Sequence, residues 1–194
     1  MANHQTDITR AQGEQWLKRY YFTRAAFSAV WVALAFSLGQ SAPAAAAVLL
    51  VIYPAWDALA NYIDLSRSGG MAANPGQTVN AWISILMTVA VLVTLQVGMT
   101  WVLGAFGAWA ILSGLLQLIA ALRRWKRYGA QWAMVLSGAQ SALAGSIFIV
   151  QAHGGMTTAI SRVAGYAAVG AIYFLVSAVW LTVSQMRRRV ATTA

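Results

Sequence analysis

The distribution of charged residues constrains the fold of this chain more than any other feature. Residues 68–122 carry no charged side chain, and residues 25–56 carry none either. The hydrocarbon of a bilayer accepts such segments, whereas a soluble domain spreads charge over its whole surface. The composition, 60% hydrophobic and 9% charged, agrees with this. We therefore predict an all-α polytopic membrane protein.

The apolar runs predict six transmembrane helices arranged as three helical hairpins, because a helix of about 20 residues crosses the hydrocarbon. Tight turns at residues 39–43 and 97–100 close the first two hairpins. One continuous helix over the third and fourth runs would be about twice as long as the bilayer is thick, so we reject it. The predicted spans are residues 22–39, 44–65, 80–98, 100–122, 131–151 and 164–186.

The basic residues predict the orientation of the chain. Twelve of the thirteen Lys and Arg lie at the N-terminus, after every second apolar run, or at the C-terminus, and Arg162 is the exception. Lys and Arg concentrate on the cytoplasmic side of membrane proteins. We therefore expect both termini in the cytoplasm, with residues 1–21 as a cytoplasmic or interfacial segment, 22–186 as the transmembrane domain and 187–194 as a basic cytoplasmic tail. No cleavage pattern follows the charged residues 1–19, so the first span should remain in the mature protein.

The formal charge of +9 could indicate a nucleic-acid partner, but the cations flank apolar segments. That position favours the lipid bilayer as the partner, with anionic headgroups at the cytoplasmic face. The chain has no cysteine, and His4 and His153 are isolated, so we expect no metal site. Nucleophile elbows, phosphate loops and catalytic triads are missing from the sequence. We predict no cofactor and no enzymatic activity.

Asp57 is the sharpest candidate for a functional residue. It precedes Arg67 by ten residues, which places it about 15 Å into a layer of about 30 Å. Helical spacing puts Pro54, Asp57, Asn61 and Asp64 on one face. A carboxylate at this depth must be paired, protonated or hydrated. Because no Lys or Arg lies within two turns, we predict an Asp57 that is protonated and shares a polar cluster with Asn61.

Two interpretations of this Asp57 cluster stay open. It could be a proton or cation site, in which Pro54 frees a backbone carbonyl beside the carboxylate. It could equally be a structural group that hydrogen-bonds to neighbouring helices. The polar partners expected for it are Gln117, Gln140 and Ser141.

Glycines on two later spans indicate close helix packing. Gly107 and Gly114 lie on the fourth predicted span, and Gly138 and Gly145 lie on the fifth. Small residues at such spacing let two helix backbones approach, within one chain or between subunits. This leaves a homo-oligomer open. Polar residues near the basic ends of three spans, Asn61, Gln117 and Ser177, indicate either an internal repeat or a coincidence.

The stretch from Phe106 to Arg124 is a glycine-containing span that ends in aliphatic residues and two arginines, and Trp132 and Leu136-Ser137-Gly138 follow it. This pattern resembles the HdeD-like family of small bacterial membrane proteins. The resemblance implies an inner-membrane location and six helices, and it suggests a role in stress response, such as acid resistance. No reaction is implied. The segment Tyr53–Asn61 departs from the family pattern because it is more polar.

Two functional hypotheses follow. The first is a non-enzymatic structural or stress-response membrane protein whose buried polar groups serve packing. The second is a small transporter or channel-like protein that moves protons or a small solute past Asp57. A wet cavity that reaches Asp57 from one side favours the second hypothesis, and a dry, packed Asp57 favours the first.

Overall fold

A computed structural model describes residues 2–126, 131–155 and 160–193, with side chains described over 12–126, 131–155 and 160–188. All secondary structure in this part of the chain is helical. Arg127 and Tyr128 of the basic loop, and the side chain of Arg189, lie outside it. The helices are α1 (Ala2–Ser37), α2 (Pro43–Arg67), α3 (Gly70–Ala73), α4 (Pro75–Val97), α5 (Met99–Arg124), α6 (Gln131–His153) and α7 (Ile160–Thr193).

Proline and glycine set the helix boundaries near the predicted turns. Pro43 and Pro75 occupy the first turns of α2 and α4, where the missing backbone N–H removes no helical hydrogen bond. Gly98 separates α4 from α5 with φ 150° and ψ 157°, a conformation that is essentially restricted to glycine. The two helices are therefore distinct, and the rejection of one continuous segment is confirmed.

Five helices in the described part are long and apolar enough to cross a membrane: Pro43–Arg67, Pro75–Val97, Met99–Arg124, Gln131–His153 and Ile160–Arg188. The first predicted span, 22–39, is not among them. Its helix, α1, becomes continuously apolar only after Arg24 and ends at Ser37, a length of about 20 Å against about 30 Å of hydrocarbon. Both α1 and α7 run without a break through the predicted domain boundaries near residues 21 and 186.

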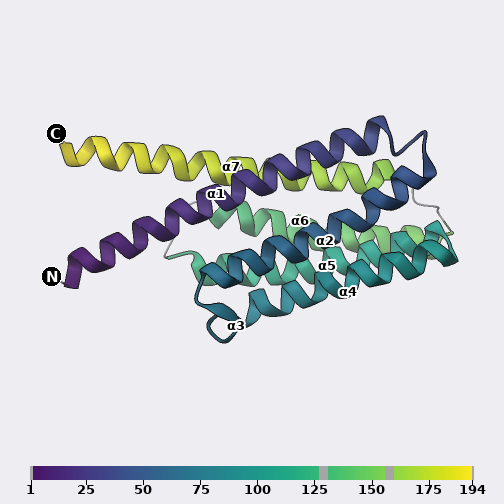
Figure 1. Ribbon diagram of the computed structural model, residues 1–194, viewed down its shortest axis with the longest axis horizontal. Helices are drawn as coiled ribbons and strands as arrows, with labels where there is room; N and C mark the ends of the chain where they lie inside the picture. The colour runs from purple at the N-terminus through teal and green to yellow at the C-terminus, as the bar shows by residue number, and fades with distance from the viewer. Residues whose placement is uncertain (1, 127–130, 156–159, 194) are drawn as a thin grey trace.

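The helices form an elongated bundle with both termini at the same end (Figure 1). The turns that join α1 to α2 and α4 to α5 lie at the opposite end, and α1 and α7 extend beyond the other helices at the terminal end. We call the end that holds the termini, α3 and the C-terminus of α5 the basic end.

The packing agrees with the predicted hairpins only in part. The closest pairs are α5 with α6, α1 with α7, and α2 with α4. Of the three predicted hairpins, α4 packs closely against α5, α6 packs less closely against α7, and α1 packs only lightly against α2. Two contacts explain the first two pairs. Glycines let α5 and α6 approach each other, and an ion pair between Glu14 and Arg188, at 2.6 Å, joins α1 to α7.

The buried apolar side chains form two clusters along the bundle. The larger cluster fills the end opposite the termini and includes Trp31, Leu50, Val91 and Phe106. The smaller cluster lies toward the basic end and comes from α1, α2, α5, α6 and α7. Both carboxylates of α2, those of Asp57 and Asp64, lie between the larger cluster, which we call the apolar layer, and the basic end. Polar chemistry inside the bundle is therefore expected in this region.

Candidate functional site

Asp57 is buried on α2, at 7% exposure, and both of its carboxylate oxygens have donors. Arg24 of α1 forms an ion pair with Oδ1. Asn61 Nδ2 and Ser84 Oγ donate to Oδ2 over 2.8 and 2.7 Å. The carboxylate thus joins three helices, α1, α2 and α4. In a low-dielectric interior, this full set of partners is what keeps a buried charge stable.

The structure corrects the expectation that Asp57 lacks a basic partner. The cation comes from another helix, since Arg24 lies 33 residues earlier in the chain. Its Nη1 donates to the Tyr20 hydroxyl over 2.8 Å, and its guanidinium lies 4.4 Å from the ring centroid of Phe174. In the sequence, Arg24 stands at the edge of the first apolar run and looks like a flanking cation. The sequence could not predict that Arg24 contacts Asp57, because the contact depends on how α1 packs against α2.

Asp64, two turns after Asp57, is fully buried and forms a second polar centre. Trp16 Nε1 donates to its Oδ1 over 2.9 Å. Gln77 Nε2 and Arg124 Nη2 donate to its Oδ2 over 3.0 and 3.2 Å. The sequence predicted Asp64 on the same face as Asp57, but its partners lie on α1, α4 and α5.

A hydrogen-bonded network connects the two carboxylates. Gln77 Nε2 also donates to Asn61 Oδ1 over 3.0 Å, and Asn61 in turn donates to Asp57. On the other side of Asp57, Trp109 Nε1 donates to Ser84 Oγ over 3.1 Å. The network therefore runs from the apolar layer to the basic end of the bundle.

Each acidic side chain in the described part is paired with an arginine from a different helix. The pairs are Glu14–Arg188, Asp57–Arg24 and Asp64–Arg124. They connect α1 to α7, α1 to α2 and α2 to α5. Because an unpaired charge inside a membrane bundle is costly, these pairs restrict how the helices can be arranged.

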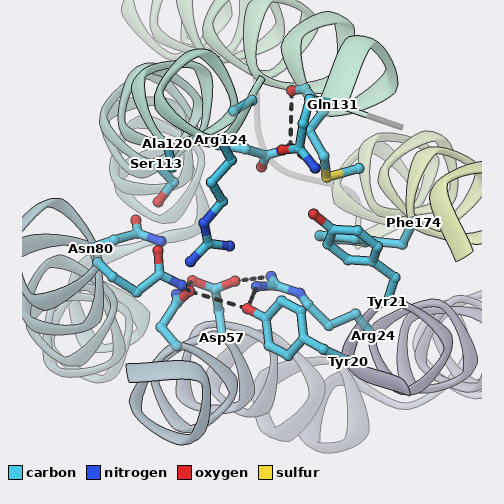
Figure 2. A pocket seen from close by; sticks show the side chains of 15 residues that line it. Tyr20, Tyr21, Arg24, Asp57, Asn80, Ser113, Ala120, Arg124, Gln131 and Phe174 are labelled. Atoms are coloured by element: carbon cyan, nitrogen blue, oxygen red, sulfur yellow. Dashed lines mark hydrogen bonds and ion pairs between the residues drawn. The ribbon is translucent and has the colours of Figure 1, made fainter. Parts of the chain in front are cut away.

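A cavity of about 60 Å³ adjoins the Asp57 carboxylate. Figure 2 shows Asp57, Arg24 and Tyr20 along the lower side of it, with Arg124 reaching toward Asp57 and with Asn80 and Ser113 at the left. Asn80 Oδ1 and Ser113 Oγ are buried without a hydrogen-bond partner. A volume of about 15 Å³ is enough for one water molecule, so a few waters or a small polar solute fit here.

A larger groove of about 680 Å³ lies at the basic end, between the first half of α1, the segment around α3, and the end of α5. We call it the basic groove. Gln77, Ala120 and Arg124 line both the groove and the smaller cavity. These shared residues lie between the two hollows, and Arg124 there is held by Asp64. The cavity beside Asp57 therefore adjoins the basic groove.

The other predicted site residues divide into two groups. Gln117 lines the cavity, and Pro54 is buried one turn before Asp57 in an uninterrupted α2. Ser141 is part of a separate contact, because its hydroxyl lies 3.0 Å from the Ala110 carbonyl and 2.5 Å from the Tyr166 hydroxyl. Gln140 does not line the cavity, and neither does Ser177. The expectation that Gln140 and Ser141 are polar partners of Asp57 is corrected. Neither residue lines the cavity, and α6 is rotated so that Ser141 contacts α5 and α7 instead.

The four glycines lie at the contact between α5 and α6. A Cβ atom added to Gly114 would lie 2.6 Å from the Gly138 carbonyl oxygen, and one added to Gly107 would lie 2.8 Å from that of Gly145. The reciprocal distances, from Gly138 to the Gly114 oxygen and from Gly145 to the Gly107 oxygen, are 2.6 and 2.5 Å. Two glycine pairs, two helical turns apart, thus bring the backbones of these helices together.

These features define a multi-pass membrane protein with a buried cluster of ion pairs and five candidate spans in its described part. Residues 79–150 match the family model described as a short repeat of unknown function, DUF308. The matched segment runs from α4 through most of α6 and includes all four packing glycines. No curated protein and no solved structure matches the chain.

Proposed function

We propose that this protein is a small, transporter-like membrane protein that binds a polar solute beside Asp57, with access from the cytoplasm. The proposal rests mainly on the cavity beside Asp57, which is lined by residues of α1, α2, α4, α5, α6 and α7. Its walls hold two arginines and two buried polar atoms without partners, Asn80 Oδ1 and Ser113 Oγ. Native structures satisfy nearly all buried polar groups, so unpartnered ones on residues that line a cavity favour a bound polar molecule.

The one-sided access supports a transport role over a sealed packing cluster. Gln77, Ala120 and Arg124 line both the basic groove and the cavity, so we infer that the cavity is reached through the groove. Beyond Asp57, the layer around Trp31, Leu50 and Phe106 is apolar and closely packed. A polar site that is open toward one face and closed toward the other corresponds to one state of alternating access.

We further propose six spans in a bacterial inner membrane, with both termini in the cytoplasm. In this arrangement α1 forms the first span, and its short apolar part is extended by the paired Arg24 and by Trp16, Tyr20 and Tyr21 near the interface. Both termini lie at one end of the bundle (Figure 1), and Arg67, Arg123 and Arg124 lie at the helix ends there, which supports this topology.

The proposal includes no catalysis. An acid–base pair needs carboxylates that can exchange protons with a substrate. Here Asp57 and Asp64 are each held by an arginine and by several hydrogen bonds. A role in binding and positioning suits such groups better than a role in proton transfer.

Solute influx into proteoliposomes tests the proposal. Urea, glycerol and glycine are suitable probes, with influx followed by stopped-flow light scattering. We expect at least one of them to enter faster than it enters protein-free liposomes. Asn80→Leu should reduce that influx because it fills the cavity, whereas Leu112→Phe, on the exposed face of α5, should not. Influx of all three probes at the protein-free rate would contradict the proposal.

The second candidate is a structural, stress-response protein of the HdeD-like type. Two observations favour it: the complete set of partners around Asp57 and the match to the DUF308 repeat, which HdeD-type proteins carry. On this account the cavity is a packing defect. Asn80→Leu should then raise the thermal stability and leave solute influx at the protein-free rate.

A further inference from the structure

The basic groove combines arginines with an apolar wall. Arg67 at the end of α2 and Arg123 and Arg124 at the end of α5 provide the cationic part. Leu116 and Ile119 of α5 provide an apolar strip next to them, and Ile119 is 44% exposed. A groove with a cationic part next to an apolar strip is complementary to a ligand that has an anionic head and an apolar tail.

The charge in the groove is only partly neutralised. Arg124 is paired with Asp64 at 3.2 Å. Neither Arg67 nor Arg123 pairs with a carboxylate in the described part of the chain. Arg67 instead lies 5.3 Å from the ring centroid of Trp16, a contact that limits its mobility while leaving its N–H groups available. Two guanidinium groups thus remain for an anion.

We propose that the basic groove binds one anionic phospholipid, with its phosphate between Arg67 and Arg123 and an acyl chain along Leu116 and Ile119. Guanidinium groups bind phosphate oxygens through two hydrogen bonds each, so arginine suits this role. The groove lies at the basic end, where the apolar surface of α5 ends, and this is the depth at which a phospholipid places its phosphate. A free phosphate would leave the strip of Leu116 and Ile119 exposed, and therefore we assign a lipid.

Binding of phosphatidylglycerol to the full chain in detergent tests this inference, with phosphatidylcholine and glycerol phosphate as comparison ligands. The groove variant is Arg67→Gln/Arg123→Gln. The control is Lys126→Gln/Arg187→Gln, which removes the same charge from exposed positions that do not line the groove. Each cation near an anionic lipid contributes roughly fivefold to affinity, so the groove variant should bind phosphatidylglycerol about 25-fold more weakly. The control should change the affinity by less than about twofold if the groove is the site.

A native mass spectrum of the wild-type chain provides a readout that needs no variant. We expect one phosphatidylglycerol to stay bound under activation that removes phosphatidylcholine. Equal weakening by the groove and control variants would show general surface attraction and overturn the proposal. Equal affinity for glycerol phosphate and phosphatidylglycerol would show that the site takes a soluble phosphate. Equal loss of both lipids in the spectrum would also overturn it.

Discussion

The structure changes the expected effect of replacing Asp57 by Asn on the stability of the protein. An uncharged, hydrogen-bonded Asp57 would tolerate Asn almost silently, because the two side chains have the same shape. In the structure, however, Asp57 neutralises Arg24 of α1. Asp57→Asn leaves a buried guanidinium without its anion, and it replaces one acceptor oxygen by a donor that faces another donor.

The expected loss can be estimated from the contacts. Removal of one partner from a buried ion pair costs about 3–5 kcal/mol. We expect about 3 kcal/mol for Asp57→Asn, because the Tyr20 hydroxyl and the Phe174 ring still contact Arg24. Asp57→Leu also removes the acceptor for Asn61 and Ser84. It should cost about 1–2 kcal/mol more, given the modest strength of hydrogen bonds within membranes.

A double-mutant cycle with Arg24→Leu separates the ion pair from the cavity effects. Because the double variant leaves no unpaired charge, it should cost at least about 2 kcal/mol less than the sum of the two single variants. The free energy of unfolding can be measured by tryptophan fluorescence during titration with sodium dodecyl sulfate in mixed micelles. An Asp57→Asn variant within about 0.5 kcal/mol of wild type, together with a coupling below that value, would refute the ion pair.

Three further predictions concern packing, the α4–α5 turn and topology. Gly138→Leu should prevent folding or assembly, whereas Leu143→Phe, at a position that is 63% exposed, should not; equal yields and melting temperatures would place this face of α6 toward lipid. Gly98→Ala should destabilise by about 1–3 kcal/mol because of its φ of 150°, and an unchanged unfolding free energy would count against that turn. In this cysteine-free chain, a cysteine at Gly154 should react with an impermeant thiol reagent added to intact cells and one at Gly70 should not; the opposite pattern would reverse the topology.

The sequence predicted the features that depend on local chemistry. Pro43 and Gly98 interrupt helices whatever surrounds them, so the turns lie close to where they were expected. The grouping of Asp57, Asn61 and Asp64 followed from helical spacing alone, and the structure places all three in one network. The small residues on α5 and α6 were similarly visible as matching strips.

The rest of the site depends on which helices are neighbours, and the sequence carries little information on that. Arg24 looks like a flanking cation until α1 is placed beside α2, where it becomes the partner of Asp57. Ser141 looked like a partner for Asp57, but the rotation of α6 directs it toward Ala110 and Tyr166. The partners of Arg24 and Ser141 therefore depend on how the helices pack, and the local sequence pattern does not determine them.

A single cysteine at Ser113 tests from which face of the membrane the cavity beside Asp57 is reached. Ser113 lines the cavity opposite Arg24, and cysteine is nearly the same size as serine. Sealed vesicles of each orientation would be treated with Ag⁺, a thiol-reactive ion small enough for a cavity of about 60 Å³, and modification would be followed by mass. The account predicts modification from the face that carries both termini, and none from the opposite face. Modification from the opposite face alone, or from neither face, would contradict it.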